Sequence, residues 1–340
     1  MGPVILVTTE KNSQLLDDIL KKYNWSSVYY FHHVLAAHDW YRGYQYDARL
    51  IPPQNRKLQK KFITFNRLTS SSRVYRSLLI SELIDQNILD QGYVSYNDQC
   101  PEGGSFRDNL QYGVNKGWYT KDVAEHAIAN INSIELPLRI DYRDQPFIPN
   151  QSFNLSAIVE SQESFVYLVT ETCYWENKCH LTEKIFKPIV SKMPFVLAGP
   201  AHNLEYLKSY GFKTFDKWWD EGYDTIEDPV DRMHAIGKVM KDICSRSLLE
   251  LSNMLVEMKD VLEYNYQLFY SKELIDLVWN EMTVNIKAAV KETEDIVPDF
   301  IYFKDSDEQE DFIKMKENMG LNDQFRQQRN LLRQQRQSTE

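Results

Sequence analysis

The 340-residue sequence contains few cysteines and no long apolar run. Its four cysteines form no Cys-x-x-Cys pair, and this usage is typical of proteins with free thiols in a reducing compartment. No apolar segment approaches the roughly 18 residues that a membrane helix needs, and the N-terminus lacks the basic start and long apolar core of a signal peptide. We therefore expect a soluble, cytoplasmic protein with no membrane partner.

Motifs for several common cofactors are also missing. No Gly-x-Gly-x-x-Gly or Gly-x-x-x-x-Gly-Lys-Ser/Thr follows an apolar run, which removes the main support for dinucleotide oxidoreductases and P-loop enzymes. Cys173, Cys179 and His180 match no recognised zinc spacing. The only Asp-x-Asp, Asp305 to Asp307, lies in a polar tail, although a site for a metal-bound diphosphate is expected at a strand end. The sequence thus predicts no metal and no cofactor.

The chain is acidic, with 39 Lys and Arg residues against 49 Asp and Glu residues and a formal charge of −10. General binding to nucleic acids needs clustered basic residues, so this balance argues against it. Hydrophobic residues make up 43% of the chain and aromatic residues 13%, which provides for a sizeable core and excludes a disordered protein.

Short apolar runs alternate with helical patterns, which is typical of a mostly parallel sheet covered by helices on both faces. The expected strands are residues 4–9, 27–33, 61–66, 92–97, 165–170, 194–199 and 212–215. The expected helices are residues 14–23, 72–89, 123–131, 183–191 and 203–210, with a long helical region over 231–287. Residues 98–160 are rich in turn formers and are expected to be an insertion.

The segment "HLTEKIFKPIVSKMPFVLAGP", residues 180–200, carries the most informative polar pattern. Thr182 is expected to cap a helix, and Glu183 and Lys184 then lie in its first turn, beside free backbone N–H groups. This geometry suits an anion such as a diphosphate, with Glu183 free to accept hydrogen bonds from a ribose. The following strand ends at Gly199, at the edge where open α/β sheets bind ligands. Simple helix capping by Thr182 and Glu183 is the alternative.

The longer segment "FVYLVTETCYWENKCHLTEKIFKPIVSKMPFVLAGP" is similar to the donor-site segment of the family 10 glycosyltransferases, the α1,3/4-fucosyltransferases. Glu171-Thr172-Cys173 falls on the family's Glu-Asn-Ser, Thr182-Glu183-Lys184 on its Thr-Glu-Lys, and residues 193–199 on its Val-Pro-Val-x-x-Gly. Upstream, the family's strand ending in Asn and its later Arg fall on Asn66 and on Arg73, with Arg76 as the alternative. The resemblance covers roughly residues 60–225, and the same combination of segments resembles phage-encoded glycosyltransferases.

The resemblance implies a fold and a set of site residues. It implies a GT-B-like α/β fold in which a doubly wound, Rossmann-like parallel sheet binds a nucleotide sugar without a metal. Arg73 and Lys184 are then expected to contact the diphosphate, Glu183 the ribose, and Glu171 the donor sugar or its loop. The remaining residues of the expected donor site are Asn66, Arg76, Thr182 and Gly199.

Three departures from the family pattern shape the expected domains. Thr172 replaces the usual Asn, the separation between Arg73 and Glu183 is about twice the family's, and only about 60 residues precede the donor domain. We expect a reduced N-terminal α/β lobe on the acceptor side at residues 1–60. A nucleotide-sugar-binding domain with an insertion at 98–160 would span 61–275, and a helical, polar C-terminal tail 276–340.

The expected reaction transfers a sugar, with inversion, from a GDP- or UDP-sugar to a hydroxyl group of a glycan, a protein or a modified DNA base. Host cytoplasm is the expected location of a phage-encoded enzyme. Such a transfer needs a general base, and Asp39 is selected for this role. Glu171 is the second residue expected to be catalytic, through its support of the donor sugar or its loop. The other candidate bases are His38, Asp47, Asp141 and Asp144. A non-enzymatic module that binds carbohydrate or protein, and another nucleotide-dependent transferase on the same scaffold, are the alternatives.

Overall fold

The computed structural model describes residues 4–47, 49–140 and 157–296. The chain divides into two units, one of residues 4–289 and one of residues 1–3 with 290–340, of which 290–296 are described. The expected domain boundaries near residues 60 and 275 remain predictions. The candidate bases Asp141 and Asp144 and the pair Asp305 and Asp307 lie outside the described residues.

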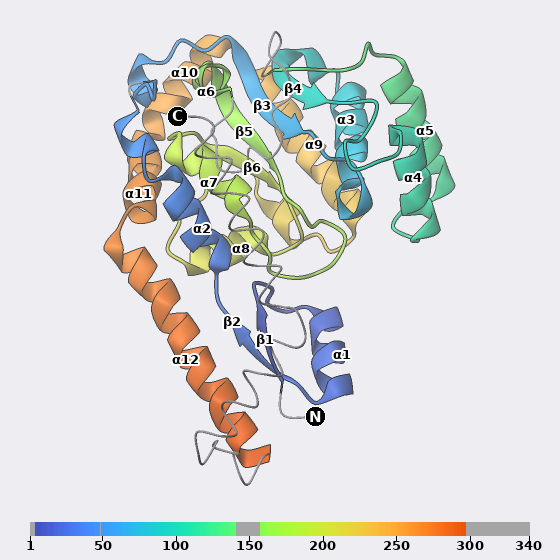
Figure 1. The fold of residues 1–340 in the computed structure, drawn as a ribbon. Helices are drawn as coiled ribbons and strands as arrows, with labels where there is room; N and C mark the ends of the chain where they lie inside the picture. Colours follow the sequence, from blue (N-terminus) through green and yellow to red (C-terminus); the bar gives the residue numbers. More distant parts are fainter. Residues whose placement is uncertain (1–3, 48, 141–156, 297–340) are drawn as a thin grey trace, which may run out of the picture. The chain divides into compact units, whose positions relative to one another are not determined.

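The larger unit contains two parallel sheets (Figure 1). A two-stranded sheet pairs β1 with β2, and a four-stranded sheet has the order β4-β3-β5-β6. The strands are β1 (Ile5–Thr8), β2 (Ser26–Tyr29), β3 (Lys60–Asn66), β4 (Gly92–Tyr96), β5 (Ser164–Thr170) and β6 (Phe195–Ala198). The expected α/β class with parallel strands is confirmed, and this architecture is compatible with a Rossmann-like fold.

Twelve α-helices lie within the described ranges. The first six are α1 (Gln14–Tyr23), α2 (His32–Tyr41), α3 (Tyr75–Asp85), α4 (Phe106–Asn115), α5 (Lys121–Asn132) and α6 (Ile158–Gln162). The others are α7 (Glu183–Val190), α8 (Asn203–Ser209), α9 (Pro229–Ser245), α10 (Leu248–Glu257), α11 (Lys259–Phe269) and α12 (Lys272–Ile296). None of the helices described is long and apolar enough to cross a membrane.

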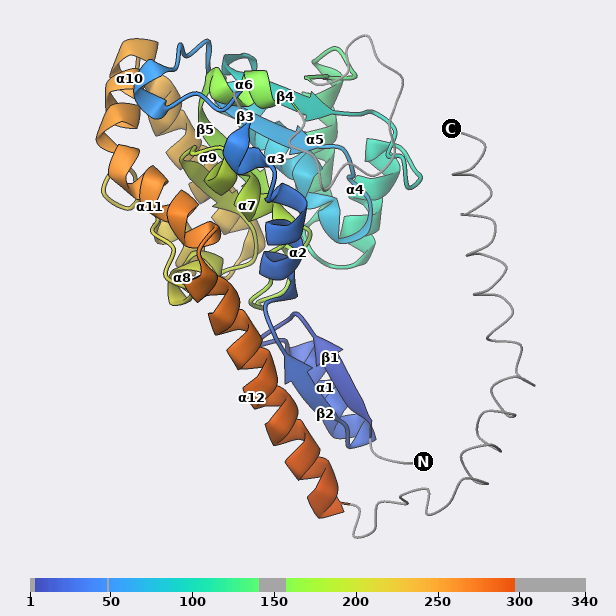
Figure 2. The same cartoon turned by 60° about the vertical axis from the view of Figure 1, so that its left-hand side comes forward.

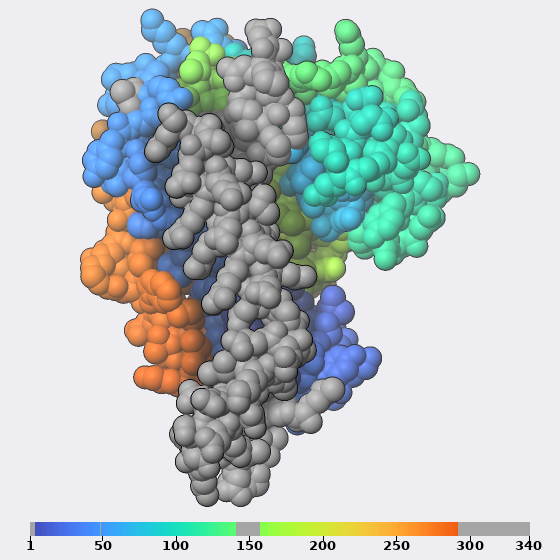
Figure 3. All heavy atoms as spheres, in the orientation of Figure 1, coloured from blue at the N-terminus to red at the C-terminus, as the bar shows by residue number. Residues whose placement is uncertain are grey.

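Helices cover the four-stranded sheet and give it a dry interior. All seven residues of β5 are buried, so both of its faces are covered. Helix α3 packs against both α5 and α9, and α2 and α11 pack against α7, which itself contacts β5 (Figure 1, Figure 2). In the space-filling view, α4 and α5 lie together on one part of the surface (Figure 3). The sheet is therefore a rigid base for the loops at its strand ends.

The expected strand at residues 212–215 is wrong. The backbone of this segment pairs with side chains and with no neighbouring strand. Lys213 N donates to Asn265 Oδ1 at 2.8 Å, Asn265 Nδ2 donates to Lys213 O at 2.8 Å, and Phe215 N donates to Glu221 Oε1 at 2.7 Å. Phe212 and Phe215 are buried. Their apolar pattern reflects burial of a loop, which a short apolar run does not distinguish from a strand.

Other boundaries also needed correction. β2 ends at Tyr29 and α2 begins at His32, so the expected strand over 27–33 is wrong at its end and α2 was missed. Helix α3 ends at Asp85, ahead of the expected 89, because Asn87 takes the left-handed φ of 54°. The long region over 231–287 is four helices, and a Ser247 capping box begins the second. The described residues of the insertion hold α4, α5 and the start of α6, where one helix was expected.

The order of the strands creates a topological switch point between β3 and β5. The chain leaves β3 for β4 on one side, and it later leaves β5 for β6 on the other. In open α/β sheets, ligands bind outside the carboxyl ends of the strands at such a point. Asn66 ends β3 and Thr170 ends β5, so the loops that begin at Arg67 and Glu171 flank the expected ligand crevice.

Candidate functional site

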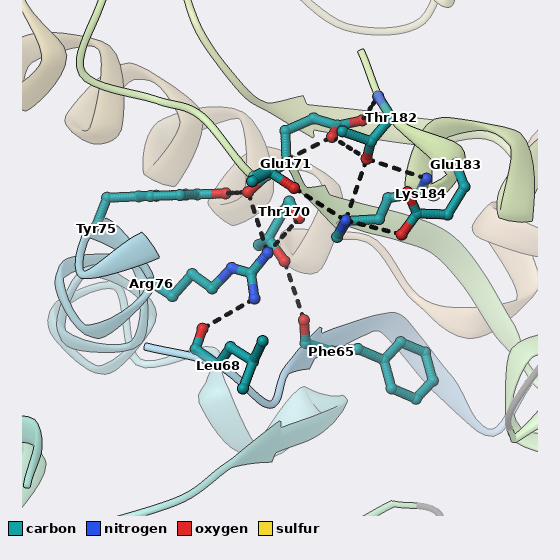
Figure 4. Close-up of polar contacts among 10 residues, drawn as sticks. Phe65, Leu68, Tyr75, Arg76, Thr170, Glu171, Thr182, Glu183 and Lys184 are labelled. Carbon is teal, nitrogen blue, oxygen red and sulfur yellow. Dashed lines mark hydrogen bonds and ion pairs between the residues drawn. The ribbon is translucent and has the colours of Figure 1, made fainter. Parts of the chain in front are cut away.

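The predicted cap of α7 is confirmed. Thr182 is the N-cap residue in an extended conformation, and its hydroxyl accepts a hydrogen bond from Lys184 N at 3.4 Å. The same threonine is held by Glu171, at the end of β5, because Thr182 N donates to Glu171 Oε1 at 3.2 Å and Thr182 Oγ1 donates to Glu171 Oε2 (Figure 4). The start of α7 is thus fixed to the end of β5.

Lys184 places its ammonium group among three oxygens at the start of α7. Lys184 Nζ lies 2.9 Å from Glu183 Oε1, 3.1 Å from Thr172 Oγ1 and 3.2 Å from Thr182 Oγ1 (Figure 4). Burial acts to raise the pKa of Glu183, but Lys184 and Lys187 outweigh it and the pKa is lowered. Glu183 is therefore ionised at neutral pH, and a fixed positive charge lies beside it at a helix N-terminus.

Glu171 is fully buried and accepts hydrogen bonds from Thr182 and from Thr172 N, the latter at 3.3 Å. Burial raises the pKa of its carboxyl group, while Lys184 and the hydrogen bonds from Thr182 act in the opposite direction. A buried carboxylate costs free energy unless it is paired. Here the Glu171 carboxylate accepts hydrogen bonds from Thr182, and the positive charge of Lys184 favours its ionised form.

Arg76 has a different environment from the one expected of a phosphate ligand. It is buried, and its Nη1 donates to Leu68 O at 2.9 Å while its Nη2 donates to Thr170 O at 2.9 Å and to Glu171 O at 3.1 Å (Figure 4). Tyr75 Oη also donates to Glu171 O, at 2.6 Å. Arg76 therefore ties the loop after β3 to the end of β5, and its donors are largely occupied by backbone carbonyls.

Arg73, the first choice for a diphosphate contact, lies in the loop between β3 and α3. Its guanidinium pairs with Glu102, with the shortest contact of 3.1 Å between Nη2 and Oε2. The neighbouring Ser72 Oγ donates to Thr172 O at 3.0 Å. Lys184 Nζ contacts the side chain of the same Thr172, so Thr172 is bonded both by Lys184 and by the residue that precedes Arg73.

Asn66 and Gly199 lie at the ends of two strands of the four-stranded sheet. Asn66 is fully buried, its Nδ2 donates to Thr64 Oγ1 at 3.3 Å, and its Oδ1 has no hydrogen-bond partner among the described residues. Gly199 follows β6, and a Cβ there would lie 3.6 Å from Glu171 Cγ, an ordinary contact. Gly199 O accepts a hydrogen bond from Arg232 Nε at 3.2 Å. The space at Gly199 therefore does not itself require a glycine.

The selected base, Asp39, lies on α2 and is exposed, where it pairs with Arg42 of the next turn. His38 packs on Phe269, with ring centroids 5.8 Å apart, and Asp47 pairs with Arg49. Within the described part of the chain, no hydrogen bond or ion pair joins any of the three to Glu171 or Lys184. Their part in catalysis remains a prediction.

His33, which was not singled out from the sequence, faces the site from the start of α2. Its ring lies 5.3 Å from that of His180, edge to face, and helix α2 packs against α7. Burial lowers the pKa of His33 to about 4, His180 acts in the same direction, and the charges of Glu183 and Glu171 act to raise it. His180 is also buried, and its Nδ1 has no hydrogen-bond partner among the residues described.

Two further residues hold the site loops and could not be identified by motif. Asn203 Oδ1 accepts His180 N at 2.9 Å, and Asn203 Nδ2 donates to Lys178 O at 2.9 Å. Arg232 is fully buried and donates to Tyr174 O at 2.7 Å as well as to Gly199 O. Both residues join the loop after β5 to the loop after β6. A lone Asn or Arg in a helix gives no sequence signal for such a role.

No group of three or more His, Cys, Asp or Glu side chains within the described ranges could hold a metal ion. A comparison with protein-family models gives no match to the chain, and a search of curated proteins gives no significant match.

Proposed function

We propose that this chain is a GT-B-type glycosyltransferase that transfers a sugar from a nucleoside diphosphate sugar to a hydroxyl acceptor, with inversion and without a metal. The observation that carries this function is the position of Lys184. Its ammonium group lies at the N-terminus of α7, beside the switch point of the parallel sheet, and is held there by Thr172, Thr182 and Glu183. Arg73, which follows the Ser72 that bonds Thr172 O, would supply a second cation.

These groups suit the charge that develops in glycosyl transfer. Cleavage of the bond between the anomeric carbon and the diphosphate leaves negative charge on the diphosphate oxygens. Fixed cations and the free N–H groups of a helix stabilise this charge more in the transition state than in the ground state. Glu183 is ionised and can accept hydrogen bonds from the ribose.

The relation between the two sheets supports the GT-B part of the proposal. Backbone hydrogen bonds join the segment after β1 to the loop after β5, from Lys11 N to Cys179 O at 3.1 Å and from Cys179 N to Lys11 O at 2.8 Å. The loops that follow β1 and β5, one from each parallel sheet, thus contact each other. A donor held by one sheet and an acceptor held by the other would face each other there.

Of the acceptor-side groups, His33 is better positioned than Asp39 to act as the general base. It would take the proton of the acceptor hydroxyl while the oxygen bonds to the anomeric carbon and the diphosphate departs with the electrons of the broken bond. The donor is a GDP- or UDP-sugar, and the acceptor a glycan, a protein or a modified base. Non-enzymatic binding of carbohydrate, or another nucleotide-dependent transfer, is the alternative.

Binding of nucleoside diphosphates tests the function directly. GDP or UDP at millimolar concentration should raise the melting temperature, because a ligand that binds only the native state stabilises it. Lys184→Ala should weaken this binding at least tenfold, since a charge-assisted contact to phosphate contributes about 1.5–3 kcal/mol. Lys121→Ala is the matched control, because it removes the same charge from an exposed pair on α5.

Two results would count against this function. The first is the absence of stabilisation by both GDP and UDP in the wild-type protein. The second is equal binding by Lys184→Ala and the wild type. A panel of nucleotide sugars, followed by release of the nucleoside diphosphate, would then separate a transferase from a module that only binds.

A further inference from the structure

A short hairpin places a carboxylate at the proposed diphosphate site. The loop after β4 closes through a bridge between Gln99 and Ser105, and Cys100 N donates to Gly104 O at 3.0 Å. Gly103 and Gly104 have φ angles of 115° and 80°, which other residues rarely adopt. This turn presents Glu102 at its tip.

Glu102 meets the loop after β3 through several polar contacts. Its Oε2 accepts a hydrogen bond from Ser70 Oγ at 2.8 Å and lies 3.1 Å from Arg73 Nη2 and 3.4 Å from Nη1, while its Oε1 lies 3.3 Å from Arg73 Nη2. The contact of both carboxylate oxygens with one guanidinium is the arrangement that a phosphate group also makes with Arg. Arg73 Nε is buried and has no hydrogen-bond partner among the described residues.

The position of this pair relates it to the Lys184 site. Ser72, next to Arg73, bonds the backbone of Thr172, and Lys184 bonds the side chain of Thr172. Arg73 therefore directly follows a residue that is bonded to Thr172, the residue that Lys184 contacts. A diphosphate that contacts both Lys184 and Arg73 would compete with Glu102 for the Arg73 guanidinium.

We propose that Glu102 is a competing anion that occupies Arg73 in the ligand-free protein and is displaced when a nucleoside diphosphate binds. This role rests on the proposed glycosyltransferase function. The Glu102 side chain is 45% exposed, whereas that of Arg73 is 18% exposed. The carboxylate can therefore turn into water at little cost while the guanidinium stays, and a diphosphate brings more negative charge to Arg73 than the carboxylate it replaces.

The direct test is the affinity of Glu102→Gln for GDP and UDP, measured by titration calorimetry. Removal of the competing charge should tighten binding about two- to fivefold, because an ion pair of this exposure has a modest strength that the ligand must overcome. Glu125→Gln is the matched control, since it removes the same charge from an exposed pair with Lys121. Guanosine and uridine, which lack phosphates, should bind Glu102→Gln and the wild type equally.

Glu102→Asp distinguishes the direct contact of the carboxylate with Arg73 from the long-range electrostatic effect of a negative charge near the site. The shorter side chain keeps the charge near the site but withdraws it from Arg73, so it should also tighten GDP or UDP binding. If wild type binds these nucleotides and Glu102→Gln binds no more tightly than Glu125→Gln, Glu102 is not a competitor and the transferase function is untouched. If neither wild type nor Glu102→Gln binds them, the function itself is contradicted and the role of Glu102 with it.

Discussion

At the scale of single residues, the Glu171 carboxylate lowers stability by being buried, although the proposed function needs it. It is fully buried, and its raised pKa shows that burial of the charge outweighs Lys184 and the hydrogen bonds around it. A neutral residue of the same shape would avoid this cost. The carboxylate nevertheless fixes Thr182 and is favoured by the charge of Lys184, and such support is what the proposed anion site needs.

Glu171→Gln should change how stability depends on pH. Above the ordinary carboxyl pKa of 4.5, the native wild type holds its proton to a higher pH than the unfolded chain does. Its free energy of unfolding therefore falls as the pH rises through the interval between these two pKa values. Gln has no such proton, so the free energy of unfolding of the variant does not fall in this way. Over that interval, the stability of the variant should therefore rise relative to that of the wild type.

Urea denaturation at a series of pH values from 4 upward measures this difference. Glu250→Gln is a useful control, because Glu250 is an exposed member of a helix cap and its pKa is lowered by Ser247. That variant should show the opposite trend, losing stability relative to wild type as the pH rises. A difference between Glu171→Gln and wild type that does not change with pH would contradict the raised pKa of Glu171.

At the scale of elements, α3 and α9 pack through a buried carboxylate. Glu82 on α3 bonds His234 Nδ1 on α9 at 2.7 Å and accepts from Gln86 Nε2 at 2.8 Å. Gly237 lies one turn further along α9, and a Cβ there would overlap the Glu82 side chain. The glycine is thus needed for close approach of the two helices, although it weakens α9 itself.

Gly237→Ala should destabilise the protein by about 3 kcal/mol. The gain in helix propensity is about 1 kcal/mol. Overpacking costs about 1–3 kcal/mol, and a displaced buried carboxylate loses hydrogen bonds at a further cost of about 1–3 kcal/mol. Urea denaturation gives the free energy of unfolding. Gly43→Ala is the control, because its Cβ would meet nothing within 4 Å, and a similar loss in both variants would exclude the contact with Glu82 as the cause.

The sequence predicted elements well where one local signal determined them. Thr182 was expected to cap a helix because its hydroxyl and the following charges belong to one turn, and it does so. The apolar runs of β3, β5 and β6 were also found, because buried parallel strands are continuous in sequence. The loop at 212–215 was mistaken because Asn265 and Glu221, which satisfy its backbone, are distant or unremarkable in sequence.

The site followed the same rule. Glu171, Thr182, Glu183 and Lys184 were expected together and are joined by hydrogen bonds. The contacts that form only in the folded chain could not be predicted from the sequence. No pattern indicated that Glu102 pairs with Arg73, or that Arg232 and Asn203 hold two loops, because each of these contacts joins segments that lie far apart in the sequence.

At the scale of the whole larger unit, each of the two parallel sheets contributes different side chains to the candidate site. The four-stranded sheet supplies Glu171 and Lys184, and the segment after the two-stranded sheet supplies His33. Two contacts within residues 4–289 hold these side chains near each other. They are the hydrogen bonds between Lys11 and Cys179 and the packing of α2 on α7. Composition and periodicity predicted both groups of strands, but only tertiary structure brings His33 beside His180.

His33→Asn should therefore separate binding from catalysis. The variant keeps a polar side chain and should bind GDP or UDP within about twofold of wild type, because Lys184 and Arg73 are unchanged. Release of nucleoside diphosphate from a nucleotide sugar should fall about 10²- to 10⁴-fold, the usual effect of losing a general base. In the wild type, the low pKa of about 4 keeps His33 neutral, so this base should not limit the rate until the pH approaches that value.

Asp39→Asn is the matched comparison, because Asp39 is the base expected from the sequence and lies exposed on the same helix. If His33 accepts the proton, Asp39→Asn should retain the wild-type rate of nucleoside diphosphate release at pH 7. The reverse result, a large loss in Asp39→Asn with full activity in His33→Asn, would return the base to Asp39. It would also mean that the acceptor approaches a different side of α2, because at about 100° per residue His33 and Asp39 project from different sides of the helix.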